Sequence, residues 1–165
     1  RNKACVSNLS DMSENTAFRR VIRDPNTNLK DNDIKKVIIC SGKVFYNLLE
    51  ERENRKLDNV KILRLEQIYP FPYSTLKEIL SDTPNAEFVW CQEEPKNMGA
   101  WFFVDRKIED VLRSFKAKFS RPSYAGRAEA ASPATGSLSR HNKEQADLVN
   151  EALETTQKTT KHAAE

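Results

Sequence analysis

The sequence predicts an α/β fold, with a mainly parallel sheet and helices on both faces. Three short runs rich in β-branched residues are each followed by a stretch with apolar residues at helical spacing. Continuous rather than alternating apolar character is typical of strands that are covered on both faces. Successive strand–helix units join parallel strands through right-handed crossovers. The three runs are Lys35–Cys40, Val60–Leu65 and Glu87–Gln92.

The first unit combines the run KKVIIC with the helix that follows it. Ser41 is placed to cap this helix, and Gly42 to make the turn before it. The helix carries an apolar stripe among amide and charged side chains, so one of its faces is predicted to pack on the sheet. The stripe consists of Val44, Phe45, Leu48 and Leu49.

The second unit has a loop between its strand and its helix. This loop, Glu66–Pro72, contains two prolines that delay the helix until Ser74. Pro84 and Asn85 then end the helix. Its buried face is predicted to consist of Leu76, Ile79 and Leu80.

The third helix has the clearest amphipathic pattern in the chain. It is predicted to run from about Gly99 to Phe115, with apolar residues at spacings of three and four. Ser123–Arg127 is a candidate edge strand. The loop Ala128–Ser139 is rich in small residues and is expected to lie against another surface. A last helix, Asn142–Leu153, also has one apolar face.

The two ends of the chain are polar, and they bound a single domain of ordinary size. The first part breaks at Asp24 and Pro25 into a stretch rich in Asn and Asp. We therefore expect a linker or docking arm over residues 1–34, an α/β domain over 35–153, and a disordered tail over 154–165. The chain starts with Arg1 rather than Met, which suggests a piece of a longer protein.

Composition argues against several classes of protein. The net charge is +3, with acidic and basic residues interspersed, so no nucleic-acid surface is predicted. The mean hydropathy is -0.70, and no apolar run is long enough to cross a bilayer. Three cysteines lie far apart, which is typical of reduced thiols in a cytosol-like compartment.

The sequence lacks the common residue motifs that catalysis by this chain alone would require. Its four glycines cannot assemble a dinucleotide-binding or phosphate-loop motif. His141, beside the last helix, and His162, in the tail, are the only histidines, so no zinc cluster, histidine dyad or nucleophilic triad is predicted. We therefore predict no catalytic, cofactor-binding or metal-binding residue in these 165 residues.

One polar cluster is a candidate binding site for a phosphate-bearing effector. Gln92, Lys96 and Asn97 are expected to begin the third helix, where free amide groups and the helix dipole attract anions. Arg127 and Arg140 join them if the small-residue loop folds back over this end of the sheet. The alternative is a polar turn, solvated or at an interface, which needs the same residues.

Four long motifs in order resemble one known family. They are CSGKVFYNLLEER (Cys40–Arg52), ILRLEQIYPFP (Ile62–Pro72), VWCQEEPKNMGAW (Val89–Trp101) and YAGR with ASPATG (Tyr124–Gly136). They resemble the carboxyl-terminal domain of the first, decarboxylating component of 2-oxoglutarate dehydrogenase. The resemblance implies the three-layer transketolase carboxyl-terminal fold, a mainly parallel sheet with one antiparallel edge strand.

The same resemblance implies cofactors and partners for the full-length enzyme. Thiamine diphosphate and magnesium bind an earlier domain in this family, so this piece is expected to bind neither and to be inactive alone. The implied partners are a second copy in a homodimer, the lipoyl-bearing succinyltransferase component and lipoamide dehydrogenase, with no nucleic acid and no membrane. The implied location is the cytoplasm in a bacterium or the mitochondrial matrix in a eukaryote.

Two functions remain open from the sequence. In the first, the chain completes an enzyme of the citric acid cycle and serves dimer assembly and active-site or regulatory support. In the second, it is a self-standing regulatory module that binds acyl-CoA or an adenine nucleotide. In the full enzyme, Glu66–Pro72 and Glu93–Met98 are expected to line a subunit or domain interface, because aromatic and proline-fixed segments suit an anchor.

Overall fold

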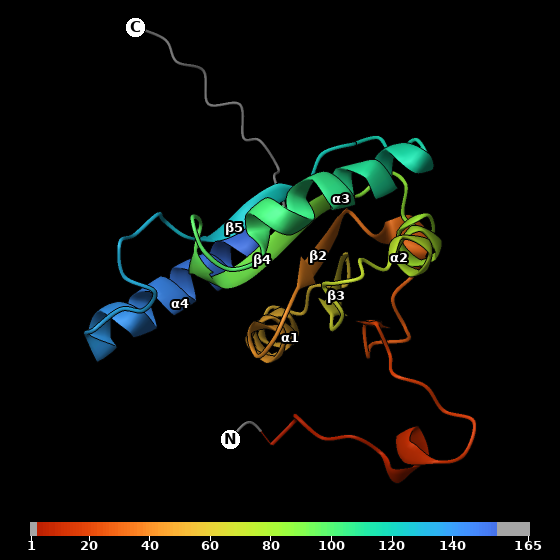
Figure 1. The fold of residues 1–165 in the computed structure, drawn as a ribbon, viewed down its shortest axis with the longest axis horizontal. Coiled ribbons are helices and arrows are strands. Elements are labelled where there is room, and N and C mark those ends of the chain that lie inside the picture. Colours follow the sequence, from red (N-terminus) through yellow and green to blue (C-terminus); the bar gives the residue numbers. More distant parts are fainter. Residues whose placement is uncertain (1–2, 155–165) are drawn as a thin grey trace, which may run out of the picture.

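A five-stranded sheet forms the centre of the molecule in a computed structural model that describes residues 3–154 (Figure 1). The strand order is β1-β3-β2-β4-β5. The strands are β1 (Val21–Ile22), β2 (Lys36–Cys40), β3 (Val60–Leu65), β4 (Glu87–Pro95) and β5 (Ser123–Arg127). The α-helices are α1 (Val44–Asn54), α2 (Tyr73–Leu80), α3 (Trp101–Ser114) and α4 (Leu138–Leu153), and two short 3-10 helices are η1 (Leu9–Met12) and η2 (Asp31–Asp33).

The three apolar runs are neighbouring strands, as predicted. β2 pairs in parallel with β3 on one side and with β4 on the other, with Ile38 opposite both Ile62 and Val89. Every residue of β2 is buried. This burial explains why the run is continuously apolar, because neither of its faces meets water.

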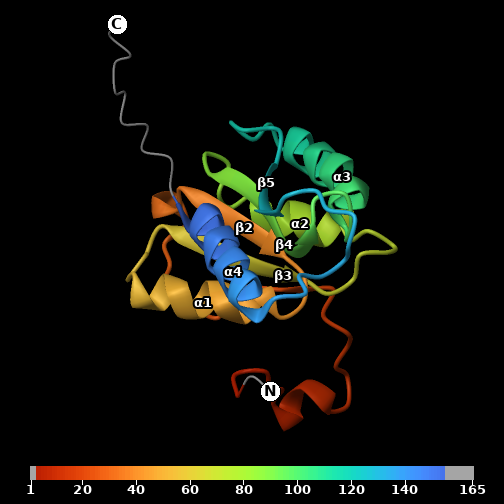
Figure 2. The same ribbon diagram turned by 90° about the vertical axis from the view of Figure 1, so that its left-hand side faces the viewer.

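Helices cover both faces of the sheet and make three layers (Figures 1 and 2). Val37 and Ile39 of β2 face a core that includes residues of α2 and α3. Ile38 and Cys40 face the opposite core, to which α1 and α4 contribute. The alternating directions of side chains along a strand therefore divide one apolar run between two cores.

The antiparallel edge strand comes from the segment that we expected to be a linker or arm. β1 pairs with β3, with Val21 opposite Leu65. Asp24 ties this segment down: its carboxylate binds the buried guanidinium group of Arg52 and accepts a hydrogen bond from the backbone N–H of Ile62. The sheet therefore takes its first strand from the segment before residue 35, which a long-range contact anchors.

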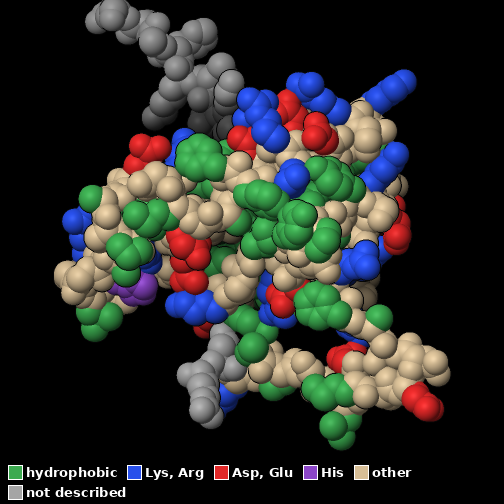
Figure 3. Space-filling view, in the orientation of Figure 1, with side chains coloured by type: hydrophobic (Ala, Val, Ile, Leu, Met, Phe, Trp, Pro, Cys, Tyr) green, Lys and Arg blue, Asp and Glu red, His purple; other side chains and the backbone are tan. Residues whose placement is uncertain are grey.

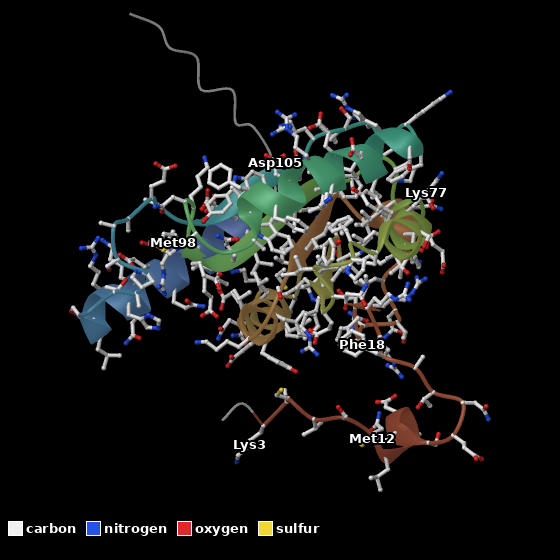
Figure 4. All side chains as sticks on the ribbon, viewed as in Figure 1. Lys3, Met12, Phe18, Lys77, Met98 and Asp105 are labelled. Carbon is white, nitrogen blue, oxygen red and sulfur yellow. The ribbon has the colours of Figure 1, made fainter. Side chains whose placement is uncertain are left out.

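The arm before β1 extends away from the sheet (Figures 1 and 4). Leu9, Met12 and Phe18 in this arm expose more than half of their surface. At the other end of the chain, the predicted disordered tail lies outside the described residues, except for Glu154.

Several predicted element boundaries shift in the structure. Ser41 does not cap α1: the helix starts after Lys43 and has no side-chain cap. Gly42 makes the turn as predicted, with φ of 75°. The last helix starts at Leu138, four residues earlier than expected. All three cysteines are free thiols, and burial raises the pKa of Cys91 to about 12.

Candidate functional site

Gln92 organises the turn that joins β4 to α3. Its side chain is buried, and its Oε1 accepts hydrogen bonds from Trp90 Nε1 at 2.9 Å and from the backbone N–H of Trp101 at 3.1 Å. Its Nε2 donates to the carbonyl oxygens of Met98 at 2.7 Å and Pro95 at 3.2 Å. These internal partners occupy the Gln92 amide, so it is not available to an effector as the sequence suggested.

Gly99 is required by this arrangement. Its φ is 67°, a left-handed conformation that glycine adopts most readily. A Cβ at this position would lie 2.9 Å from Gln92 Nε2. A residue with a side chain at position 99 would therefore clash with the buried amide of Gln92, so this turn requires glycine.

Lys96 and Asn97 do not begin the third helix, in contrast to the prediction. β4 continues to Pro95, which is opposite Arg127 of β5 after an irregularity in the pairing, and α3 starts only at Trp101. Asn97 exchanges two hydrogen bonds with the backbone of Ala130, at 3.0 and 3.1 Å. This amide pair holds the small-residue loop against the turn, in which Figure 4 labels Met98.

Arg127, at the end of β5, is nearly buried and ties the sheet to α4. Its side chain is 9% exposed, and one terminal nitrogen lies 3.0 Å from His141 Nδ1 and 3.3 Å from Gln145 Oε1. Its Nε is 3.6 Å from a carboxylate oxygen of Glu144 and has no hydrogen-bond partner. Arg127 therefore combines a structural role with one buried donor that remains unsatisfied.

Arg140 lies on the first turn of α4 and is 75% exposed. It pairs with Glu144 at 2.7 Å, one helical turn further along. A hydrogen bond from Thr135 and the charge of Arg140 lower the pKa of Glu144. The spacing of four residues between Arg140 and Glu144 could have indicated this pair in the sequence, but the contact with Thr135 could not be predicted from spacing.

One cavity brings the two arginines together. It has a volume of about 500 Å³ and lies between the loop of residues 128–137 and α4. Arg127 and Arg140 line it, whereas Gln92, Lys96 and Asn97 do not. An anion in this cavity would compete with carboxylates for the arginines. The carboxylates in its lining are Glu129, Glu144, Asp147 and Glu151.

A second cavity lies where the parallel strands β2 and β4 end. It has a volume of about 460 Å³, and Ser41 and Glu93 form part of its polar wall. Ile68 and Phe103 form part of its apolar wall. The strand order reverses at β2, and crevices at such switch points are where α/β proteins bind ligands. The apolar wall is not recognisable from the sequence, because its residues come from different strand–helix units.

Across residues 3–154, no group of three His, Cys, Asp or Glu side chains is arranged to hold a metal ion. No helix in the same part of the chain is both long and apolar enough to span a bilayer.

The five-stranded sheet with a pair of helices on each face places the chain among the three-layer α/β domains. Within that class, the chain belongs to the family described as 2-oxoglutarate dehydrogenase C-terminal, whose model matches residues 6–153. The match includes β1 and part of the arm as well as the predicted domain.

Relatives of known name agree with this family. The 2-oxoglutarate dehydrogenase E1 components of Brucella anthropi and Brucella ovis are both 48% identical to this chain over 161 residues. The match covers 93% of this chain but only 16% of each relative. A solved split-gene transketolase, described as an inactive β4 tetramer, aligns with a TM-score of 0.49 and 15% identity over 86% of this chain and 44% of its own.

These comparisons confirm the family that the four sequence motifs suggested. They favour the carboxyl-terminal part of an E1 component over the alternative of a self-standing regulatory module. The chain spans about a sixth of the curated relatives that it matches.

Proposed function

We propose that this chain is the carboxyl-terminal part of an enzyme that oxidatively decarboxylates 2-oxoglutarate and transfers the succinyl group to a lipoyl-bearing protein in the citric acid cycle. The observation that carries the proposal is 48% identity to named E1 components over nearly the whole chain. The proposed partners are a second copy of the protein, the lipoyl-bearing succinyltransferase and lipoamide dehydrogenase. The proposed location is the cytoplasm in a bacterium or the mitochondrial matrix in a eukaryote.

The chemistry of this enzyme would reside outside these residues. Thiamine diphosphate, when bound, supplies the carbanion stabilisation that decarboxylation requires. The residues present do not fit this cofactor with magnesium: the sequence lacks the Gly-Asp-Gly motif by which the resembling family binds the diphosphate and magnesium, and residues 3–154 hold no group of three His, Cys, Asp or Glu side chains arranged for a metal ion. His141, a candidate proton carrier, lies 3.0 Å from the guanidinium group of Arg127 and helps to hold α4.

The contribution of the chain in this proposal is structural support for the rest of the enzyme. The Gln92 turn and the Arg127 contacts rigidly join β4, β5, α3 and α4 at one end of the sheet. Such a fixed end provides a defined surface for packing against another domain or subunit.

Two measurements test this proposal. The full-length protein is expected to release CO₂ from 2-oxoglutarate when supplied with thiamine diphosphate, magnesium and an artificial electron acceptor. The 165-residue chain, once circular dichroism shows it folded, is expected to show no heat of cofactor binding in calorimetry. An inactive full-length protein, or saturable cofactor binding by the short chain, would contradict the proposal.

A second proposed role is regulatory anion binding in the cavity that Arg127 and Arg140 line, with Lys96 beside it through the hydrogen bond from its backbone N–H to the Arg127 carbonyl. It is supported by the buried, unsatisfied Nε of Arg127 in a cavity that Arg140 also lines. Arg127→Glu would disrupt the contacts that hold α4, so Arg140→Glu and Lys96→Glu are the cleaner changes. The matched control is Arg113→Glu, an exposed arginine paired with Glu109 four residues earlier on α3.

The test is titration of the full-length enzyme with acetyl-CoA and with AMP. Loss of the effector response in Arg140→Glu or Lys96→Glu, with basal turnover retained, supports the site. The control should respond as the unaltered enzyme does. A response that survives both changes would show that the effector binds elsewhere.

A further inference from the structure

Aromatic side chains are exposed together between the loop before α2 and the first turn of α3. Tyr69 is 79% exposed, Tyr73 42% and Phe103 41%. Phe71 supports them from below and is buried. Together with Lys107 these residues are called the aromatic face, and Figure 3 shows hydrophobic side chains gathered over α3 on the side of the molecule that it displays.

The members of the aromatic face contact one another in a fixed pattern. The ring centroids of Tyr69 and Phe103 are 6.4 Å apart, and those of Phe71 and Tyr73 are 4.9 Å apart, both with edge-on geometry. The ammonium group of Lys107 lies 4.8 Å from the centroid of Phe103 and 5.7 Å from that of Tyr73. The face is therefore preorganised, and packing against it costs little side-chain entropy.

The aromatic face continues into the cavity at the ends of β2 and β4. Phe103 belongs to both, and Ile68 lines the cavity beside it. Glu93 and Glu94 stand on the polar side of the same cavity. An apolar surface that borders a cavity with a charged rim is typical of an interaction site rather than of a scattered exposed residue.

The charge of Lys107 indicates which kind of side chain a segment packed on the aromatic face would carry. Among the residues that the structure describes, no carboxylate pairs with Lys107; its polar contact is a 3.4 Å hydrogen bond to the Tyr73 hydroxyl. A segment that covers the rings would also remove water from this ammonium group, which is costly unless a carboxylate accompanies it. The chemistry that fits is an apolar segment with an acidic side chain.

We propose that such a segment, from the part of the full-length protein outside these 165 residues, packs on the aromatic face. This chain covers only 16% of the length of its relatives, so in those proteins most of the polypeptide lies outside the matched region. A covalently attached segment has a high effective concentration, which favours it over a free partner. The inference rests on membership of this longer family and not on the proposed enzymatic activity.

Photo-crosslinking in the full-length protein tests the inference. Phe103 is replaced by p-benzoylphenylalanine, and the matched control carries the same residue at Phe119, which is 39% exposed. Phe103 should crosslink to a peptide outside these residues, with the product migrating as a single chain under denaturing conditions. A product of twice the chain mass would identify a second copy instead, and no product above the control would mean an open face; either result overturns the inference.

A second measurement does not depend on crosslinking chemistry. Phe103→Glu in the full-length protein should increase the rate of limited proteolysis between this domain and the rest by several-fold, because the anchored segment is released. Lys107→Glu should have a similar effect through charge repulsion of the acidic segment. Phe119→Glu should leave the cleavage rate unchanged. Equal rates in all three variants would overturn the inference, and because turnover is not measured, this outcome is distinct from failure of the proposed function.

Discussion

Replacing Gln92 by Met should be among the most destabilising polar changes in this chain. The side chains are similar in length, but Met lacks the amide oxygen that accepts the hydrogen bonds from Trp90 Nε1 and the Trp101 backbone N–H. Each buried donor left without a partner costs about 1–3 kcal/mol. The carbonyl of Met98 also loses its donor. We therefore expect the free energy of unfolding to fall by about 3–5 kcal/mol.

Urea unfolding followed by tryptophan fluorescence measures this loss on the 165-residue chain. The control is Gln67→Met, which removes one hydrogen bond to the Pro70 carbonyl at an exposed position and should cost less than about 1 kcal/mol. If the two variants unfold at the same urea concentration, then Gln92 does not hold the turn. A changed slope of the transition would instead indicate that the turn unfolds separately from the sheet.

Further changes test the core, the anchored edge strand and the buried thiols. Leu112→Ala should lower the free energy of unfolding by about 2–5 kcal/mol, and an unchanged denaturant midpoint would place Leu112 outside the core. Asp24→Ala should cost about 3–5 kcal/mol, because the buried guanidinium group of Arg52 loses its partner; a loss below about 1 kcal/mol would mean that β1 is not anchored there. At pH 8, Cys5 should react with a thiol reagent while Cys91 should not, and modification of both at equal rates would contradict the raised pKa. Because burial raises the pKa of Cys91 from about 9 to about 12, its contribution to stability should be full below pH 9 and be lost as the pH rises toward 12, as alkaline unfolding would show.

The anion site predicted at the start of the third helix shows that residues close in sequence need not form one binding site. Gln92, Lys96 and Asn97 are close in sequence, and a helix start there would have aligned them around one ligand. β4 instead continues past Gln92 because β5 offers it a pairing partner as far as Arg127. The additional strand length moves the start of α3 to Trp101 and leaves each of the three side chains in a different environment.

The amino-acid sequence by itself determined the class of fold and the family. Apolar runs identified β2, β3 and β4 because burial on both faces favours apolar residues along most of a central strand. The amphipathic periods identified α2 and α3, because one face of each helix meets the core. Both patterns involve only residues that are close in sequence, so they can be recognised without knowing which elements pack against them.

The tertiary structure alone decided which distant residues meet. The use of the supposed arm as an edge strand, the hydrogen bonds between Asn97 and Ala130, and the contact of Tyr69 with Phe103 all join segments that lie far apart in the sequence. No periodicity encodes these contacts, because they depend on how two cores pack against opposite faces of one sheet. The elements follow from local patterns of apolar residues, whereas the surfaces that bind or anchor a partner follow from the packing of those elements.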